Sequence, residues 1–467
     1  MTNPNLAASS LLGPLFASRE MRALFSDRAS IGLMLAVEIA LANAEAATGV
    51  IPRGAAAPIA AACDPARFDL DAIAEAAPSS GNIAIPLVKA LTAAVAKRDA
   101  EAARFVHWGA TSQDIIDTAT VLAIKQGEEL IGRDLDRAIK ALAVLARRNA
   151  KKPMAGRTWL QQALPITFGL KAARWAAMLA RAREGLHDAA TAAAVLQFGG
   201  AAGTLASLGS KGPAVAKRLA AELELELPDM PWHGERDRIA SVASALGILI
   251  GAAGKIARDI SLLMQTEIAE VFEPAAEGRG GSSTMPHKRN PVACAQILSA
   301  ATLAPGLVSS VLSGMTQEHE RALGGWQAEW IALPQLFLLA SGVAARLAEA
   351  TKGLEIDTKR MHTNLDATNG LIMAEAVQTA LGEKLGRMQA HDLLEQASKR
   401  AVSEGRHLRE IIAETPALAD ELPGKTLDAL FDPAAYLGSA ADFIERGLKS
   451  AESALAIAEA KTKRKKR

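Results

Sequence analysis

A stretch near the middle of the chain concentrates side chains that can bind an anion and move a proton. Between 278 and 291 it carries hydroxyls, cations, an imidazole and an amide, namely Ser282, Ser283, His287, Lys288, Arg289 and Asn290. Gly280 permits a tight turn, and Pro286 and Pro291 discourage helix in the residues before them. A loop of this length inside a helical protein usually has a function. The alternative is a solvent-exposed linker in which Asn290 only caps the next helix, and composition does not decide between the two.

A second cluster, at 107–118, precedes a long helical pattern. Thr111 and Ser112 place two hydroxyls at its start, and Thr111 and Asp114 have the spacing of a capping box. A helix N-terminus with adjacent hydroxyls is also a site for carboxylates, because its free N–H groups carry partial positive charge. The two roles are compatible, and both remain open. For His107, a place in the core and a contact with substrate are the two alternatives.

The rest of the sequence predicts the helices that position these segments. Apolar residues recur three or four apart over the approximate ranges 30–48, 169–196, 239–272 and 292–313. A β-branched alternation never persists. Half of the residues are apolar but only 4% are aromatic, so small aliphatic side chains must fill the spaces between closely packed helices. We therefore expect an all-α protein with a long central helical bundle.

Short Gly and Pro signals divide this helical chain into three parts. We expect an N-terminal helical domain over 1–106 and a central long-helix domain over 107–355, which contains the loop at 278–291. A C-terminal helical domain over 356–467 completes the chain. Its last seven residues are nearly all Lys and Arg, and we expect a solvated tail there.

Charge and cysteine content exclude several classes of protein. The chain has 52 Lys and Arg against 51 Asp and Glu, so no overall field favours nucleic acid or a membrane surface. Cys63 and Cys294 are its two cysteines, too few for a disulfide framework or a Cys-based metal site. The first ten residues lack a signal-peptide pattern, and the uncharged apolar segments fall short of the ~20 residues of a membrane span. We expect a cytoplasmic protein with neither a metal nor an organic cofactor.

The loop near the middle of the chain is recognisable. Its residues 281–291 read GSSTMPHKRNP, which resembles the signature GSSxMPxKxNP of the fumarase/aspartase superfamily at every fixed position. Members are helical homotetramers whose active sites each collect segments from three subunits. The resemblance implies that Ser282 is the catalytic base, and that Lys288 and Asn290 help to bind a substrate carboxylate or to hold the loop. Lys288 is also a candidate to stabilise the serine alkoxide.

A third segment departs from the pattern of that superfamily. Residues 156–163 resemble its GRTHxQxA region, and Gln161 matches the glutamine, but Trp159 replaces the histidine. Members that release hydroxide or an amine need to protonate it, and general acid help is worth ~10²–10⁴-fold. A carboxylate, with a reference pKa near ~4, leaves as an anion without such help. Trp159 therefore favours lactone chemistry.

Further stretches at 81–91, 106–109 and 318–330 resemble the 3-carboxy-cis,cis-muconate cycloisomerase branch of the superfamily. The resemblance implies reversible closure of this small tricarboxylate to a lactone, by a homotetramer that binds neither nucleic acid nor membrane. The residues implied to bind or enclose the substrate are Thr111, Ser112, His107, Gln161, Trp159, Lys288, Asn290 and Arg321.

Alternatives remain for single residues and for the whole chain. Arg321 has the alternative of a surface ion pair with Glu318 or Glu320. Surface or capping roles are expected of the scattered histidines, His187, His233, His362, His391 and His407. An adenylosuccinate-type or other fumarate-releasing lyase is the alternative enzyme, and a non-catalytic helical scaffold is the alternative without chemistry.

Overall fold

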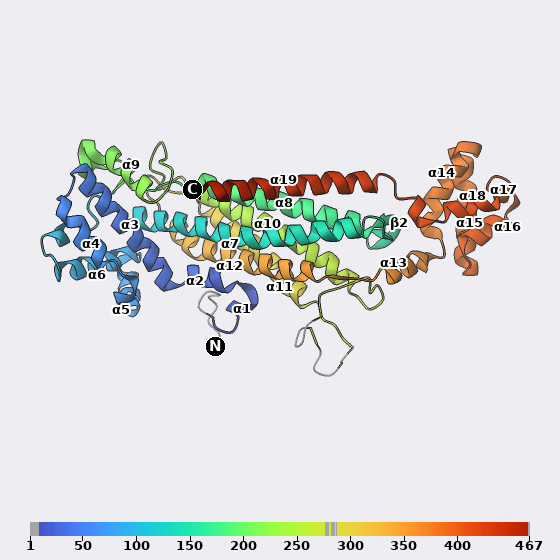
Figure 1. The fold of residues 1–467 in the computed structure, drawn as a ribbon, viewed down its shortest axis with the longest axis horizontal. Coiled ribbons are helices and arrows are strands. Elements are labelled where there is room, and N and C mark those ends of the chain that lie inside the picture. The colour runs from blue at the N-terminus through green and yellow to red at the C-terminus, as the bar shows by residue number, and fades with distance from the viewer. Residues whose placement is uncertain (1–8, 276–279, 282–284, 286, 466–467) are drawn as a thin grey trace. The chain divides into compact units, whose positions relative to one another are not determined.

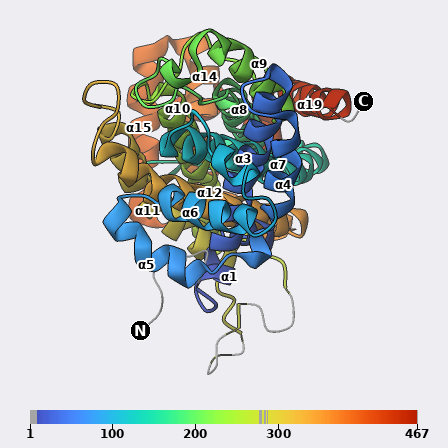
Figure 2. The ribbon, with the colours of Figure 1, turned by 90° about the vertical axis from the view of Figure 1, so that its left-hand side faces the viewer.

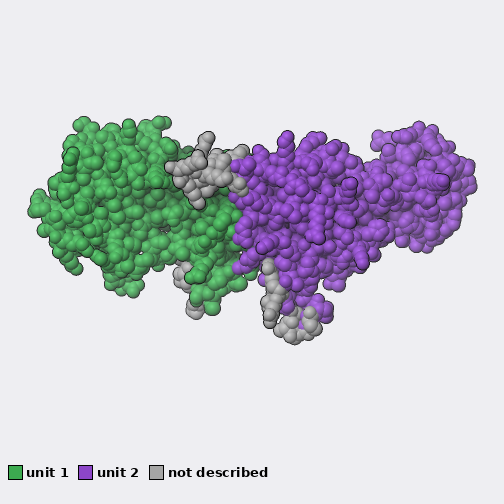
Figure 3. All heavy atoms as spheres, in the orientation of Figure 1, with its two compact units in different colours: residues 1–134, 182–254, 296–345 green, residues 135–181, 255–295, 346–467 purple. Residues whose placement is uncertain are grey.

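The computed structural model describes residues 9–275, 280–281, 285 and 287–465, with side chains to 456, and their regular secondary structure is almost entirely helical (Figure 1). The chain divides into two compact units (Figure 3). Unit 1 comprises Met1–Asp134, Ala182–Gly254 and Gln296–Ala345, and unit 2 comprises Leu135–Arg181, Lys255–Ala295 and Arg346–Arg467. Each unit therefore combines three separate stretches of sequence. The expected division into three consecutive domains stays a prediction.

The N-terminal part of unit 1 is built around helix α3 (Asp27–Thr48). This helix begins where Ser26 accepts a hydrogen bond from the amide of Ala29, and it ends where Gly49 adopts the left-handed φ of 71°. The other elements of this part are α1 (Gly13–Phe16), α2 (Arg19–Leu24), η1 (Arg53–Ala55), α4 (Ala56–Ala62), η2 (Pro65–Arg67), α5 (Leu70–Ser80), α6 (Ala84–Ala96), η3 (Ala102–Phe105), η4 (Ala206–Lys211) and α9 (Gly212–Glu222). Apolar side chains of α3, α4, α6 and α9 form one buried core.

The longest helices supply the bundle. They are α7 (Ser112–Arg148), α8 (Phe168–Ala193), α10 (Asp237–Leu263), α11 (Val292–Ser313), α12 (Gly325–Lys352) and α19 (Ala440–Lys465). Helices α7, α10 and α12 run alongside one another (Figure 1), and Figure 2 shows them end-on. Their fully buried residues are mostly Ala, Leu, Ile and Val, as the low aromatic content predicted. The all-α class with a long central bundle is confirmed.

Two small antiparallel sheets interrupt the helices. Strand β1 (Pro153–Thr158) pairs with β2 (Gln161–Thr167), and the two-residue β3 (Val271–Phe272) pairs with β4 (Glu355–Ile356). The sequence had indicated almost no strand, so the β1–β2 hairpin corrects that expectation. Its turn, at Trp159 and Leu160, has none of the Gly, Asn or Asp residues that mark a two-residue hairpin.

The C-terminal part of unit 2 has a core of its own, formed by residues such as Leu381, Leu394 and Ile411. Its elements are α13 (Thr358–Leu365), η5 (Asp366–Thr368), η6 (Leu371–Met373), α14 (Ala374–Leu385), α15 (Arg387–Glu404), α16 (Leu408–Glu414), α17 (Pro416–Ala419), α18 (Gly424–Leu430) and η7 (Pro433–Ala435), followed by α19. His407 caps α16, because its Nδ1 accepts from the amide of Arg409 at 3.1 Å. This is one of the capping roles expected of the scattered histidines.

Four described helices, α3, α10, α11 and α12, are long and apolar enough to cross a membrane by length and composition alone. In α3, α10 and α12, 61%, 61% and 72% of the apolar window is buried inside the protein, as expected of core helices, but in α11 only 28% is. Helix α11 therefore presents apolar side chains outward, among them Leu303, 56% exposed, and Leu312, 46% exposed.

Helix α3 also buries a carboxylic acid that has no partner. Glu45 is 0% exposed, and neither of its side-chain oxygens has a hydrogen-bond partner in the described chain. Burial raises the pKa of Glu45 to about 9, and the charge of Glu38 adds to this effect. The fold therefore holds a protonated acid here at neutral pH.

Replacing Glu45 by glutamine should stabilise the protein, and increasingly so as the pH rises. The folded state binds the Glu45 proton more tightly than the unfolded chain, so its penalty is absent below pH ~4 and grows toward pH 9. Glutamine keeps the shape and cannot ionise. We expect Glu45→Gln to raise the free energy of unfolding by about 3 kcal/mol near pH 7, as measured by urea unfolding at pH 5, 7 and 8.5. The same substitution at exposed Glu75 should show no such trend. A stability difference at Glu45 that is independent of pH would contradict the interpretation.

Candidate active site

In unit 1, the start of α7 and the segment before α12 meet at Arg321. The guanidinium donates from Nη1 to Thr111 Oγ1 at 2.7 Å and from Nε to Gln113 Oε1 at 3.4 Å. Both acceptors are neutral oxygens, and the described residues show Arg321 in no ion pair with Glu318 or Glu320, which corrects that alternative. The positive charge is held in place without being cancelled by a bonded carboxylate, so it is available to an anionic ligand.

The two hydroxyl residues at the start of α7 lie where the motif predicted. The hydroxyl of Thr111 accepts from Arg321, while Asp114 Oδ2 accepts from the backbone amide of Thr111 at 3.0 Å. One of the two hydrogen bonds of a capping box is therefore present, from the Thr111 amide to the Asp114 carboxylate. The Thr111 hydroxyl binds the Arg321 guanidinium. Ser112 is half-buried as the first residue of the helix. The structure thus brings Thr111, Ser112 and Arg321 together.

The carboxylate of Asp114 fixes this helix end to a neighbouring loop. Asp114 is 1% exposed and accepts from the amides of Gly199 and Gly200, both at 2.9 Å. It also accepts from Gln197 Nε2 at 3.2 Å and from His233 Nε2 at 2.8 Å. His233 is 3% exposed, so the expectation of a surface or capping role is wrong for this histidine. Its burial follows from the acceptor that Asp114 provides.

One turn further along α7, Asp117 belongs to a buried ion cluster. Arg236, with 1% of its side chain exposed, donates to Asp117 at 2.7 and 3.1 Å and to Glu329 at 3.0 and 2.6 Å. Trp326 Nε1 also donates to Asp117, at 2.9 Å. Burial raises the pKa of Glu329 above its usual value, and the charge of Arg236 opposes this rise. No local sequence pattern predicted this cluster.

Gln113 joins the ion cluster to Arg321. Its Nε2 donates to Asp117 Oδ2 at 3.0 Å and to the carbonyl of His233 at 2.9 Å, and its Oε1 accepts from Arg321. Because an ionised carboxylate only accepts and a guanidinium only donates, the amide has one possible orientation. The position of Arg321 is therefore tied to fully buried groups.

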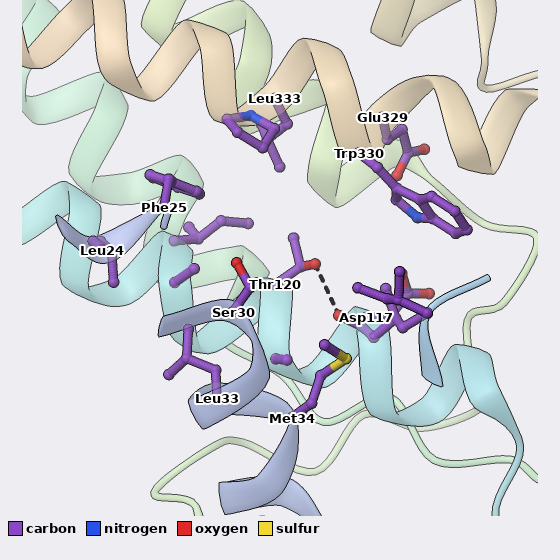
Figure 4. A pocket seen from close by; sticks show the side chains of 16 residues that line it. Leu24, Phe25, Ser30, Leu33, Met34, Asp117, Thr120, Glu329, Trp330 and Leu333 are labelled. Atoms are coloured by element: carbon purple, nitrogen blue, oxygen red, sulfur yellow. Dashed lines mark hydrogen bonds between the residues drawn. The ribbon is translucent and has the colours of Figure 1, made fainter. Parts of the chain in front are cut away.

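A mostly apolar cavity of about 160 Å³ is lined in part by Asp117 and Glu329 of the ion cluster. Figure 4 shows Asp117, Glu329 and Trp330 toward one end and Leu24, Phe25 and Leu33 toward the other. Its lining contains two acids and no Lys, Arg or His. An anionic ligand is therefore disfavoured in this cavity.

The predicted catalytic base, Ser282, lies outside the described residues. The end of its loop is described in unit 2, where Lys288 is exposed and the amide of Asn290 donates to the carbonyl of Gly280 at 2.9 Å. Gly280 has a φ of 68°, and a Cβ there would lie 2.8 Å from the carbonyl oxygen of Asn290, so glycine is required. A hollow of about 220 Å³ is lined by Gly280, Gly281, Lys288, Arg289 and Asn290 of the loop, together with Met264 and the segment 273–275.

Two anchors hold the base of this loop. Arg289 donates to both carboxylate oxygens of Glu355 at 2.9 Å and to the carbonyl of Glu273 at 2.7 Å. The carboxylate of Glu273 accepts from the amides of Ala293 and Cys294, at 3.0 and 2.8 Å. Glu273 therefore supplies the capping oxygens of α11 that the linker interpretation had assigned to Asn290.

The third predicted segment forms the tip of the β1–β2 hairpin in unit 2. Trp159 is 97% exposed and Leu160 is 78% exposed, and both have left-handed backbones, with φ of 52° and 65°. The hairpin is anchored close to its turn, since Arg157 pairs with the fully buried Glu270 at 2.7 and 3.0 Å. Gln161 is exposed beside the turn. The hairpin thus presents Trp159 and Gln161 outward from an anchored turn, and a role for either in the pocket stays a prediction.

The fold and these segments define a class of enzyme. A family model described as "Lyase" matches residues 16–306, and one described as "Adenylosuccinate lyase C-terminus" matches residues 370–447. The chain belongs to this lyase family, the fumarase/aspartase superfamily that its signature loop predicted.

Within that superfamily the similarity is to one branch. The 3-carboxy-cis,cis-muconate cycloisomerase of Bradyrhizobium diazoefficiens is 58% identical over 96% of this chain and 99% of its own length. The protein of that name from Pseudomonas aeruginosa is 52% identical over 95% of this chain and 97% of its own length. The crystal structure of 3-carboxy-cis,cis-muconate lactonizing enzyme from Pseudomonas putida superposes with a TM-score of 0.91, at 48% identity, over 95% of this chain and 99% of that one. The chain is a member of the cycloisomerase branch.

Proposed function

We propose that this enzyme interconverts 3-carboxy-cis,cis-muconate and a carboxymuconolactone, in the breakdown of aromatic compounds through protocatechuate. The observation that carries the proposal is similarity along the whole chain to enzymes of that name. Trp159 supplies a chemical reason, because a lactone opens to a carboxylate that leaves without protonation. No metal or organic cofactor is required by this chemistry.

Ring closure forms one carbon–oxygen bond and one carbon–hydrogen bond. In ring closure, a substrate carboxylate oxygen adds to an alkene carbon, and a proton is delivered to the carbon α to another carboxylate. Ser282 carries that proton in our proposal, and Lys288 stabilises its alkoxide. Arg321, with the hydroxyls of Thr111 and Ser112 at the start of α7, holds substrate carboxylates.

We also propose that the enzyme is a cytoplasmic homotetramer that collects each site from several copies. Three long helices, α10, α11 and α12, expose large apolar side chains. These are Ile248, Leu303, Leu312 and Ile331, and exposed apolar surface of this kind marks an interaction site. In our proposal another copy of the chain buries this surface, with no membrane and no nucleic acid involved. Light scattering of the purified protein is expected to give four times the mass of the chain.

The assay that tests the substrate follows loss of conjugated-diene absorbance after 3-carboxy-cis,cis-muconate is mixed with purified protein. We expect rapid loss with formation of a lactone. The second candidate function is a fumarate-releasing lyase, which the match of the C-terminal part to the adenylosuccinate lyase model favours. No absorbance change with a folded tetramer, together with cleavage of an amine-bearing succinate, would replace the first function by the second.

A further inference from the structure

Helix α3 contributes a second buried acid, Glu38, which reaches a predicted site residue far along the chain. Glu38 has 1% of its side chain exposed, and its Oε1 lies 2.6 Å from Nδ1 of His107. The histidine side chain is 17% exposed, so the contact is largely shielded from water. A carboxylate and an imidazole this close form a strong, charge-assisted hydrogen bond when the ring is protonated.

The backbone around His107 is shaped for this contact. His107 has a left-handed φ of 58°, a conformation that costs a residue other than glycine about 1 kcal/mol. Gly109, two residues on, has a φ of 71°, and a Cβ there would lie 2.5 Å from the side chain of Leu208. The segment that leads into Thr111 is thus held in a restricted conformation, with the imidazole of His107 against Glu38.

Both charged groups that act on His107 are acids. Glu38 faces it from α3, and Asp114 acts on it from the first turn of α7. Burial lowers the pKa of His107, but the two carboxylates outweigh this and leave that pKa above its usual value. The ring is therefore an imidazolium over a wider pH range than a free histidine.

The state of the ring determines what its other nitrogen offers. Nε2 of His107 makes no hydrogen bond to any described residue. In a neutral ring held by Glu38, the proton sits on Nδ1 and Nε2 presents a lone pair, which repels a carboxylate. In the imidazolium, Nε2–H is a charged donor that attracts one.

We propose that Glu38 is a positioning residue of the active site, which holds His107 by Nδ1 so that its Nε2–H binds a carboxylate of the substrate. This inference rests on the proposed function, because three substrate carboxylates call for cationic donors beyond Arg321 and Lys288. Glu38 itself touches no substrate. It acts through the orientation and the charge of the imidazole.

The test is Glu38→Gln, which keeps the length of the side chain and an oxygen acceptor for Nδ1–H but removes the charge. We expect kcat/KM to fall by more at pH 8 than at pH 6, on the order of tenfold at pH 8, mostly through KM. Glu45→Gln is the matched control on the same helix. Because Glu45 is uncharged at neutral pH, its pH profile should follow wild type. An equal loss at every pH in Glu38→Gln would indicate a structural role only and would overturn the proposal.

A binding measurement separates this inference from the identity of the substrate. Calorimetry with 1,2,3-propanetricarboxylate, a saturated tricarboxylate that cannot react, should show Glu38→Gln binding about tenfold more weakly at pH 8 than at pH 6, with proton uptake at pH 8. If this dependence appears but wild type does not turn over 3-carboxy-cis,cis-muconate, the proposed substrate falls and the role of Glu38 stands. Wild type that binds no tricarboxylate would overturn both.

His107→Gln provides a second route if Glu38→Gln does not fold. Glutamine at 107 can still donate to Glu38, and it has no titrating group. Its tricarboxylate affinity should be low and nearly the same at pH 6 and pH 8. Wild-type affinity in His107→Gln would remove the imidazole from the site and with it the role of Glu38.

Discussion

Replacing Ser282 by alanine should reduce kcat for ring closure by about 10⁴-fold while leaving a folded tetramer. In the proposed reaction this hydroxyl carries the only proton that moves, and proton-transfer groups contribute ~10²–10⁴-fold. Trp159 stands in place of the superfamily histidine and offers no acid or base to compensate for the loss. Initial rates of diene loss give kcat, and thermal melting with light scattering reports fold and assembly.

Ser283→Ala is the matched control for this variant. It removes a hydroxyl from the adjacent position of the same loop, and it should keep turnover within about tenfold of wild type. Wild-type turnover in Ser282→Ala would end the assignment of the base. A loss of the same size in both variants would show that the loop conformation, and not one hydroxyl, was damaged.

The parts of the fold that the sequence predicted are those that local pattern controls. The apolar spacing of three and four residues in α8, α10 and α11 is a property of each segment by itself, and so is the capping geometry at Thr111. The signature loop is also local, and it identified the superfamily before any contact was known. Thr111 and Arg321 were both predicted site residues, so their contact follows once the fold brings them close together.

The β1–β2 hairpin was missed because its turn defies local preference. Trp159 and Leu160 both adopt left-handed φ, which bulky residues avoid and which Asn-Gly turns provide without strain. The pairing of Arg157 with buried Glu270, 113 positions away, helps to hold the strands in place. Long-range contacts of this kind override propensity, and one sequence without a structure does not reveal them.

The buried polar cluster was missed for a related reason. Asp117, Arg236 and Glu329 lie in or next to three different helices. In the sequence, Arg236 is 119 positions from Asp117 and 93 positions from Glu329. Each of these residues alone is an ordinary charge on a helical pattern. The one available signal is a charge within an apolar stretch, and it does not identify the partner.

Removing the arginine of this cluster is expected to have the largest effect on stability. Arg236→Met deletes the only cation bonded to Asp117 and Glu329 in the described chain, and leaves two carboxylates at 2% and 5% side-chain exposure. Breaking a buried ion pair from one side costs about 3–5 kcal/mol. Urea unfolding should register a loss of that size, whereas Arg218→Met, which breaks an exposed pair with Glu222, should cost no more than ~1 kcal/mol.

The sign of the pH dependence separates lost charge pairing from lost packing. Without Arg236 nothing opposes the effect of burial on Glu329, whose pKa is raised even in its presence. The folded variant then binds a proton more tightly than its unfolded chain, so its stability relative to wild type should recover as the pH falls from 8 to 5. Adding Glu329→Gln to Arg236→Met should recover part of the loss at pH 8, because one uncompensated charge is gone. A deficit that is the same at every pH and in both variants would mean that the cluster contributes shape and not charge.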